Sequence, residues 1–165
     1  LYGMVVDDFN QDGNLDIALN GNDFGTEVTT GRYDALNGLI MLGDGKGNFS
    51  AQTILKSGVF IPGDGKSLVK LRGSGNTYLL AASQNNGPLK IFKNNTDQRL
   101  IPLKEDDQLL LITLKDGRIR REEIAYGSSF LSQSSRFTKV DDNIQKIEAI
   151  NARKEKRVIF AAKPE

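Results

Sequence analysis

The sequence contains no histidine, no cysteine and no tryptophan among its 165 residues. Without histidine or cysteine, the chain cannot form Ser-His or Cys-His nucleophilic pairs, the usual zinc sites or a disulfide framework. The missing cysteine does not fix the redox compartment, since many exported bacterial proteins also lack disulfides. Any chemistry of this chain therefore proceeds without imidazole or thiol groups.

The sequence also has no excess of positive or negative charge and no long apolar run. Lysine and arginine number 22 against 21 acidic residues, and glutamates interrupt the basic stretches "GRIRREE" and "ARKEKR". No basic stripe for nucleic-acid phosphates is therefore present. The longest apolar run, "LLLITL" at 109–114, is far shorter than the ~20 residues of a membrane-spanning helix. The sequence predicts neither a nucleic-acid partner nor a transmembrane span.

The chain does contain many short apolar runs, rich in Val, Ile, Leu and Phe and separated by Gly, Asn and Asp. This pattern is typical of an all-β fold, and no amphipathic helix of about ten residues is expected. The runs predict strands at 4–7, 15–20, 38–43, 48–55, 67–72, 77–83, 89–94, 109–115, 118–126, 144–150 and 157–162. The stretches "GDGKGN" and "KDG" are predicted hairpin turns, because glycine adopts positive φ without a Cβ clash.

Two segments of the chain repeat weakly. Gly13 aligns with Gly75 and Asn14 with Asn76, and each segment is followed by a further predicted strand. The repeated unit is therefore strand, loop, strand, connection and strand, which predicts sheets stacked face to face. Only the first copy has acidic and amide side chains throughout its loop. At four of these positions the second copy carries Lys70, Arg72, Ser74 and Tyr78.

The first loop, "DFNQDGNLD", has an oxygen-bearing side chain at every second position: Asp8, Asn10, Asp12, Asn14 and Asp16. A loop of this spacing can wrap around Ca²⁺, with Asn14 contributing its backbone carbonyl. A cation would also relieve the repulsion among the crowded carboxylates. The loop therefore predicts a calcium site. A metal-free polar turn, a magnesium site and an EF-hand are the alternatives, although an EF-hand requires a glutamate where Leu19 stands.

With these residues, "DDFNQDGNLDIAL" followed by "NGLIMLGDGKGNF" resembles the FG-GAP or VCBS repeat, the blade unit of integrin-α-like β-propellers. The resemblance covers residues 3–54 and implies a four-stranded antiparallel blade that binds calcium through the same five residues. Residues 67–95 resemble a second, degenerate blade without the metal. A complete propeller has about four to eight blades, so the resemblance implies an incomplete propeller, part of a longer chain, that packs with missing blades.

Residues 116–137 resemble the ASPIC/UnbV C-terminal module, which often follows such repeats in bacterial surface proteins and in the cartilage acidic protein family. The most specific part is "SSFLSQSSR" at 128–136. The chain departs from that module in having "TKVDDN" and "NARKEKR" where a Gly-Leu-Gly turn and a Trp-Pro-x-Gly hairpin are usual. Two domains are therefore expected: propeller blades at 1–98 and a small β module at 99–165.

The insertion "GNDFGTEVTTGRYDALNG" at 21–38 is longer than the equivalent segment of the second copy. Long loops often carry binding function, so it is a candidate partner-binding loop. The side chains of interest are Glu27, Arg32, Tyr33 and Asp34. A polar loop that pairs only with itself is the alternative.

These features predict a non-catalytic, calcium-binding scaffold or binding module of a bacterial cell-surface or secreted protein, extracellular or periplasmic, that recognises a protein or glycan. The alternatives are a purely structural domain and a carbohydrate-active enzyme using the acidic pairs at 7–8, 106–107 and 141–142. Adjacent carboxylates on a strand point to opposite faces and make poor catalytic pairs. The serine-rich run at 128–135 has no histidine or Ser-x-x-Lys partner, so we expect it to hydrogen-bond a strand edge.

Overall fold

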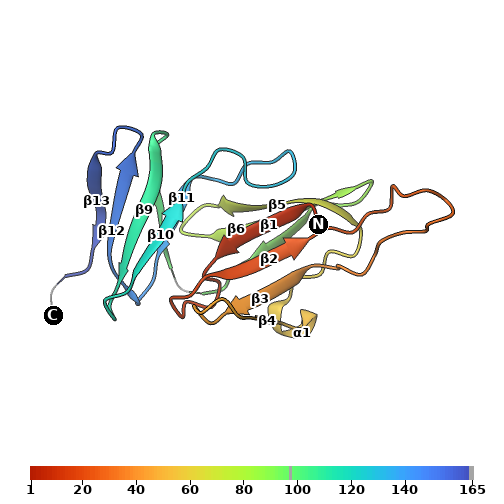
Figure 1. Cartoon of the computed structure of the whole chain (residues 1–165), viewed down its shortest axis with the longest axis horizontal. Helices are drawn as coiled ribbons and strands as arrows, with labels where there is room; N and C mark the ends of the chain where they lie inside the picture. Colours follow the sequence, from red (N-terminus) through yellow and green to blue (C-terminus); the bar gives the residue numbers. More distant parts are fainter. Residues whose placement is uncertain (97, 164–165) are drawn as a thin grey trace. The chain divides into compact units, whose positions relative to one another are not determined.

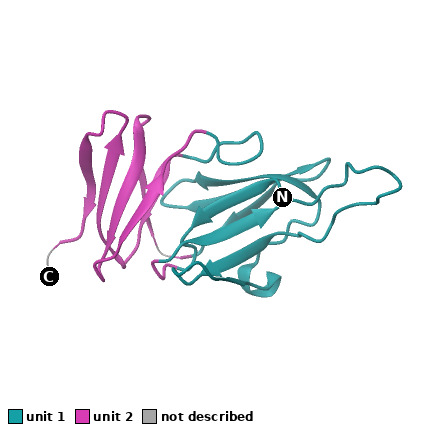
Figure 2. Ribbon diagram, viewed as in Figure 1, with its two compact units in different colours: residues 1–10, 14–95, 127–135 teal, residues 11–13, 96–126, 136–165 magenta. Residues whose placement is uncertain are grey.

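The structure is a computed structural model that describes residues 1–96 and 98–163. The described residues form antiparallel sheets with one short helix, which confirms the all-β prediction (Figure 1). Cα packing divides the chain into two compact units (Figure 2). The first comprises residues 1–10, 14–95 and 127–135, and the second comprises the described residues of 11–13, 96–126 and 136–165.

The first unit contains two sheets whose strands follow one another along the chain. One sheet has the order β1-β2-β3-β4, with strands Gly3–Asp7, Asp16–Asn20, Leu39–Gly43 and Phe49–Ala51. The other has the order β5-β6-β7, with strands Asp64–Arg72, Tyr78–Asn85 and Lys90–Lys93. Both sheets thus begin with a hairpin and add a third strand, as the repeat in the sequence predicts.

The strand predicted at 48–55 is only partly right, because β4 ends at Ala51 and a helix begins at Ile54. Helix α1 spans Ile54–Ser57, and the Thr53 side chain caps its start by accepting a hydrogen bond from the Lys56 amide. Gly58 ends the helix with a φ of 69°, a conformation that glycine adopts at little cost.

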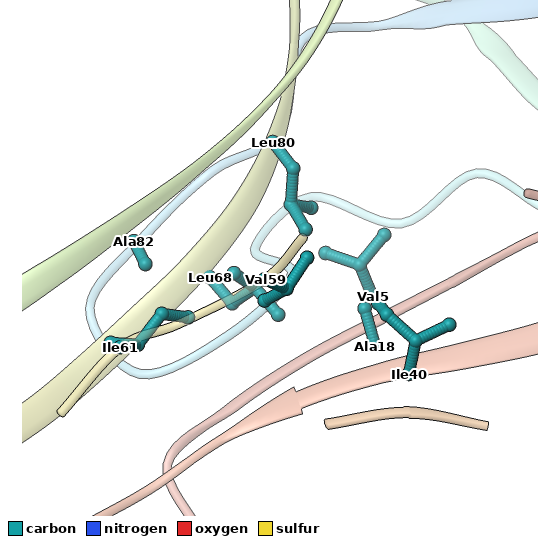
Figure 3. Packing of buried hydrophobic residues seen from close by; sticks show 8 residues of the cluster. All are labelled: Val5, Ala18, Ile40, Val59, Ile61, Leu68, Leu80 and Ala82. Carbon is teal, nitrogen blue, oxygen red and sulfur yellow. The ribbon is translucent and has the colours of Figure 1, made fainter. Parts of the chain in front are cut away.

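The core of the first unit lies between its two sheets. Val5, Ala18 and Ile40 come from the first sheet, and the other buried members of this cluster come from the second sheet and the connection before it (Figure 3): Val59, Ile61, Leu68, Leu80 and Ala82. Gly3 permits the close approach of β1 to β5, since a Cβ there would lie 2.7 Å from the Leu68 amide nitrogen. Burial of these aliphatic side chains stabilises the stacked sheets.

The second unit has a four-stranded sheet and a two-stranded sheet. The larger has the order β10-β9-β12-β13, with strands Ile119–Glu123, Asp107–Leu114, Ile144–Asn151 and Lys156–Ala161. The smaller pairs β8 (Arg99–Pro102) with β11 (Phe137–Val140). A separate apolar cluster forms its core, including Leu110, Ile112, Val140 and Ile147.

Candidate metal site and binding loop

The predicted calcium loop connects β1 to β2. The two strands pair in register as far as Asp7 opposite Asp16, and residues 8–15 form the bend between them. Gln11 and Gly13 adopt left-handed backbone conformations, with φ values of 63° and 87°. The turn therefore reverses the chain over an irregular path, not in a tight two-residue hairpin.

Asp16 holds the base of this loop together. Its side chain is fully buried, and its two oxygens accept hydrogen bonds from the amides of Phe9 at 2.8 Å and Gly43 at 2.9 Å. A side chain at Gly43 would bring Cβ to 2.2 Å from the Leu15 carbonyl oxygen, so only glycine allows this approach. Asp16 therefore fixes two backbone amides at the base of the loop.

The five predicted ligands differ in exposure along the loop. Asp8 and Asp16 are buried at the base, Asn14 is half-buried, and Asn10 and Asp12 are exposed towards the tip. Over residues 1–96 and 98–163, no three acidic, histidine or cysteine side chains converge as a metal-binding group. Asp8 and Asp16 are the two predicted carboxylates that the structure buries. All five positions supply oxygen donors, the ligand type that Ca²⁺ prefers.

The backbone at the tip of the loop is held by residues of the second unit, to which residues 11–13 belong. Arg120 Nη1 donates to the Gly13 carbonyl at 3.2 Å, and Asn143 Nδ2 donates to the Gln11 carbonyl. These bonds fix the part of the loop that carries Asp12. The position of Asp12 therefore depends on Arg120 and Asn143, which lie outside the two repeated segments.

Asp7 is a third buried carboxylate at the loop base and was not among the predicted ligands. Its Oδ2 accepts hydrogen bonds from Lys70 Nζ at 3.1 Å and from the Tyr78 hydroxyl at 3.0 Å. Its Oδ1 accepts one from the Asp8 amide at 2.9 Å. Asp7 therefore has its own cationic partner. An acidic residue directly before the loop was the only sequence signal for it, because Lys70 and Tyr78 lie far along the chain.

The corresponding turn of the second sheet, residues 73–77 between β5 and β6, is shorter. The Gly73 amide donates to the Thr77 carbonyl at 2.8 Å, and Gly75 and Asn76 adopt left-handed conformations. Tyr78 begins β6 as Asp16 begins β2. The two hairpins therefore share strand topology, while their turns differ in both length and side-chain chemistry.

The insertion at 21–38 extends away from the ends of β2 and β3 (Figure 1). Its two arms pair through a bridge in which the Asp23 and Tyr33 backbones exchange hydrogen bonds of 2.8 Å. Arg32 lies over the Phe24 ring, 4.8 Å from its centroid. All four predicted partner-binding residues are exposed: Glu27, Arg32, Tyr33 and Asp34. The loop is thus internally paired while presenting these side chains to solvent.

A charged network anchors the base of the insertion to β5. Lys66 Nζ lies 2.7 Å from Asp64 Oδ1 and 3.3 Å from Asp23 Oδ1, and the Tyr2 hydroxyl donates to Asp23 Oδ2 at 2.6 Å. The hydrogen bond from Tyr2 is the main reason that the pKa of Asp23 lies below its ordinary value. Burial opposes ionisation of Asp64, but hydrogen bonds from Lys66 and Asn85 lower its pKa.

The acidic pairs considered for catalysis contain carboxylates in structural contacts. Besides Asp7, Asp107 is buried and its Oδ2 lies 2.8 Å from Arg157 Nη2. Asp141 Oδ1 accepts a hydrogen bond from the Asn143 amide at 2.9 Å. Each of these contacts fixes a strand end or turn.

The serine-rich run pairs with the edge of β5, as predicted. The hydroxyls of Ser129 and Ser134 accept hydrogen bonds from the amides of Leu68 and Lys70, at 3.4 and 3.1 Å. The Ser135 amide donates to the Lys70 carbonyl at 2.8 Å. These bonds satisfy backbone groups at a sheet edge that would otherwise lack a strand partner.

The comparisons with known proteins found no matching family model, curated protein or solved structure. Among the described residues, no helix has the length and apolar character needed to cross a membrane.

Proposed function

We propose that the chain is a non-catalytic, calcium-binding scaffold or binding module of the β-propeller type, belonging to a bacterial cell-surface or secreted protein. It acts outside the cell or in the periplasm and recognises a protein or glycan. The observation that carries this proposal is the loop between β1 and β2, where Asp8 and Asp16 are buried beneath the exposed Asn10 and Asp12. Together with Asn14, these residues place carboxylate and amide oxygens at alternate positions, and oxygen is the ligand type that Ca²⁺ prefers.

The outer face of the first sheet supports the propeller part of the proposal. Strand alternation places on this face the side chains that point away from the core, and nearly all are apolar. Cross-strand partners form two apolar rows: Val6, Ile17, Met41 and Ala51, and Met4, Leu19 and Leu39. Met4 and Val6 are 47% and 43% exposed. An apolar face of this kind favours a further packed sheet, as in a stack of propeller blades.

The calcium proposal is tested directly by isothermal titration calorimetry on the parent chain and on Asp12→Ala. Asp12 is exposed, so its removal should leave the fold intact while deleting one ligand. We expect saturable calcium binding by the parent, clearly weaker binding by the variant, and little heat with magnesium. Equal binding by both proteins, or none by the parent, would contradict the metal site.

The recognition proposal is tested on the insertion loop. Glu27→Ala combined with Tyr33→Ala removes two exposed side chains and keeps the backbone bridge between Asp23 and residue 33. Capture of surface polysaccharides or proteins should fall in this variant and persist in a matched control with Lys46→Gln, an exposed change in another turn. Reproducible turnover of a polysaccharide, abolished by an acidic substitution, would favour the enzyme alternative.

A further inference from the structure

A pocket of about 340 Å³ opens between the two sheets of the first unit. Its walls are apolar and come from both sheets and the segment that joins them: Ile40, Leu42, Val59, Leu80 and Phe92. This volume is at the lower end of the range of small-molecule sites, which are also mainly apolar with a few polar groups. The pocket is therefore large enough for a compact ligand and too small for an extended polymer.

Two aromatic rings form a fixed part of the lining. Phe9 and Tyr78 stack with their centroids 6.3 Å apart and their planes at 26°. The Phe9 backbone is held on both sides, since its amide donates to Asp16 and its carbonyl accepts from Asn94 Nδ2 at 3.4 Å. The Tyr78 hydroxyl donates to Asp7. A wall held in this way is formed before a ligand arrives, which lowers the entropic cost of binding.

The lining residues carry positive charge and no negative charge. Lys56, from α1, and Lys93, at the end of β7, both line the pocket and are exposed, and no aspartate or glutamate lines it among the residues that the structure describes. Within the part of the chain that the structure describes, neither ammonium forms an ion pair. The side-chain amides of Gln52 and Asn95 add neutral hydrogen-bond donors. Charge of one sign above low-dielectric walls attracts an anion.

We propose that this pocket binds a small anionic amphiphile, in which an aromatic ring system or short acyl chain carries a single carboxylate. The apolar body packs between the sheets against Phe92 and Leu80, and the carboxylate lies at the mouth near Lys56 and Lys93. This binding activity goes beyond the proposed scaffold function. It uses none of the five calcium ligands except Asn10, which is one of the lining residues.

The probe for this site is 2-naphthoate, with neutral 2-naphthol of the same ring size as its uncharged counterpart. Both are titrated by calorimetry into the parent chain, with calcium and with chelator. The parent should bind 2-naphthoate saturably and more tightly than 2-naphthol in both conditions. The double variant Lys56→Gln/Lys93→Gln should weaken 2-naphthoate by about tenfold and leave 2-naphthol unchanged, because each exposed charge contributes modestly.

Two further variants separate the pocket from general surface binding. Ser57→Phe places a bulky side chain in the lining and should abolish binding of both probes, while the unfolding midpoint reports that the fold is kept. Lys46→Gln/Lys90→Gln removes two lysines outside the pocket and should change neither affinity. Absence of saturable 2-naphthoate binding by the parent would overturn the proposal. So would unchanged affinity in a folded Ser57→Phe protein, or equal losses in the two double lysine variants.

Discussion

The two hairpins of the first unit begin their sheets in the same way and turn differently. In the first, residues 8–15 carry acidic and amide side chains above the buried Asp16. In the second, residues 73–77 close with glycine and asparagine in left-handed conformations and contain no acidic residue. Since the second hairpin forms without carboxylates, hairpin formation alone does not require those of the first. They serve either the proposed calcium site or the local contacts that Asp16 makes.

The largest expected effect comes from replacing Asp16. Asp16→Ala removes the acceptor for the amides of Phe9 and Gly43. Hydrogen bonds to a charged group contribute about 1.5–3 kcal/mol each, so we expect the loss of two to lower the free energy of unfolding by roughly 3–6 kcal/mol. Chemical denaturation in the presence of chelator measures the loss without any metal contribution.

The matched change in the second hairpin is Tyr78→Phe, because Tyr78 occupies the equivalent strand position. It removes one hydrogen bond to Asp7 and keeps the ring, which predicts a loss of about 1 kcal/mol. Equal losses for Asp16→Ala and Tyr78→Phe would show that the first loop has no special structural carboxylate.

Calcium should produce the next largest effect, and only through the first hairpin. A ligand bound only by the folded state stabilises it by ~2.7 kcal/mol at 100 times its dissociation constant, which raises the thermal midpoint by roughly 5 to 10 °C. Asp12→Ala should remove most of this shift. Ser74→Ala, at the equivalent position of the second turn, should keep it. If calcium raises the thermal midpoint of Asp12→Ala as much as that of the parent, the ion does not bind at this loop.

Glycine-to-alanine substitutions should destabilise the two turns to different extents, because the space around the two glycines differs. A Cβ at Gly75 meets nothing within 4 Å, so Gly75→Ala should cost only the left-handed backbone conformation, about 1 kcal/mol. A Cβ at Gly13 would lie 3.1 Å from both Leu114 Cδ1 and Arg118 Nη2. Gly13→Ala should therefore cost more, about 2 kcal/mol, by urea denaturation. The reverse order would show that the first turn adjusts more freely.

The smallest expected effect is the pH dependence of the network that joins the insertion to β5. The pKa values of Asp23 and Asp64 are lowered in the folded state, so their stabilisation is present above the unfolded value of about 4 and is lost as the pH falls through the folded values. Asp64→Asn should flatten this acid decline in thermal midpoints measured between about pH 5 and pH 2. Asp116→Asn provides the comparison: its carboxylate also has a lowered pKa, but it is exposed in another turn, so this change should flatten the decline less than Asp64→Asn.

At alkaline pH, stability changes in the opposite direction and falls as the pH rises. Burial opposes ionisation of Lys66, but its contacts with Asp64 and Asp23 raise its pKa. The stabilisation by Lys66 is therefore complete below the unfolded value of about 10.4 and is lost as the pH rises through the folded value. Lys66→Met should remove that decline above about pH 10, measured by thermal unfolding. If the thermal midpoint of the variant falls with pH as it does in the parent, other groups cause the alkaline loss of stability.

Much of the all-β fold could be predicted from the sequence, because apolar runs such as 109–114, bounded by turn residues, are strong local signals for strands. The sequence did not predict β8 and β11, since each has only four residues, and β11 also contains the buried polar side chains of Thr138 and Lys139. Helix α1 was missed although Thr53 and Gly58 are ordinary capping residues. The partners of Asp7 could not be predicted, because contacts with Lys70 and Tyr78 depend on how two sheets stack.

The serine-rich segment also has a consequence for the order in which the protein folds. Residues 127–135 complete the first unit by bonding the edge of β5, yet they follow about half of the second unit along the chain. During synthesis, the two N-terminal sheets therefore emerge from the ribosome before their last element. Until Ser134 and Ser135 arrive, the Lys70 backbone lacks these bonds, and an open strand edge favours association between nascent chains. A unit closed by such distant residues should fold slowly for its size, because its last contacts require closure of a long loop.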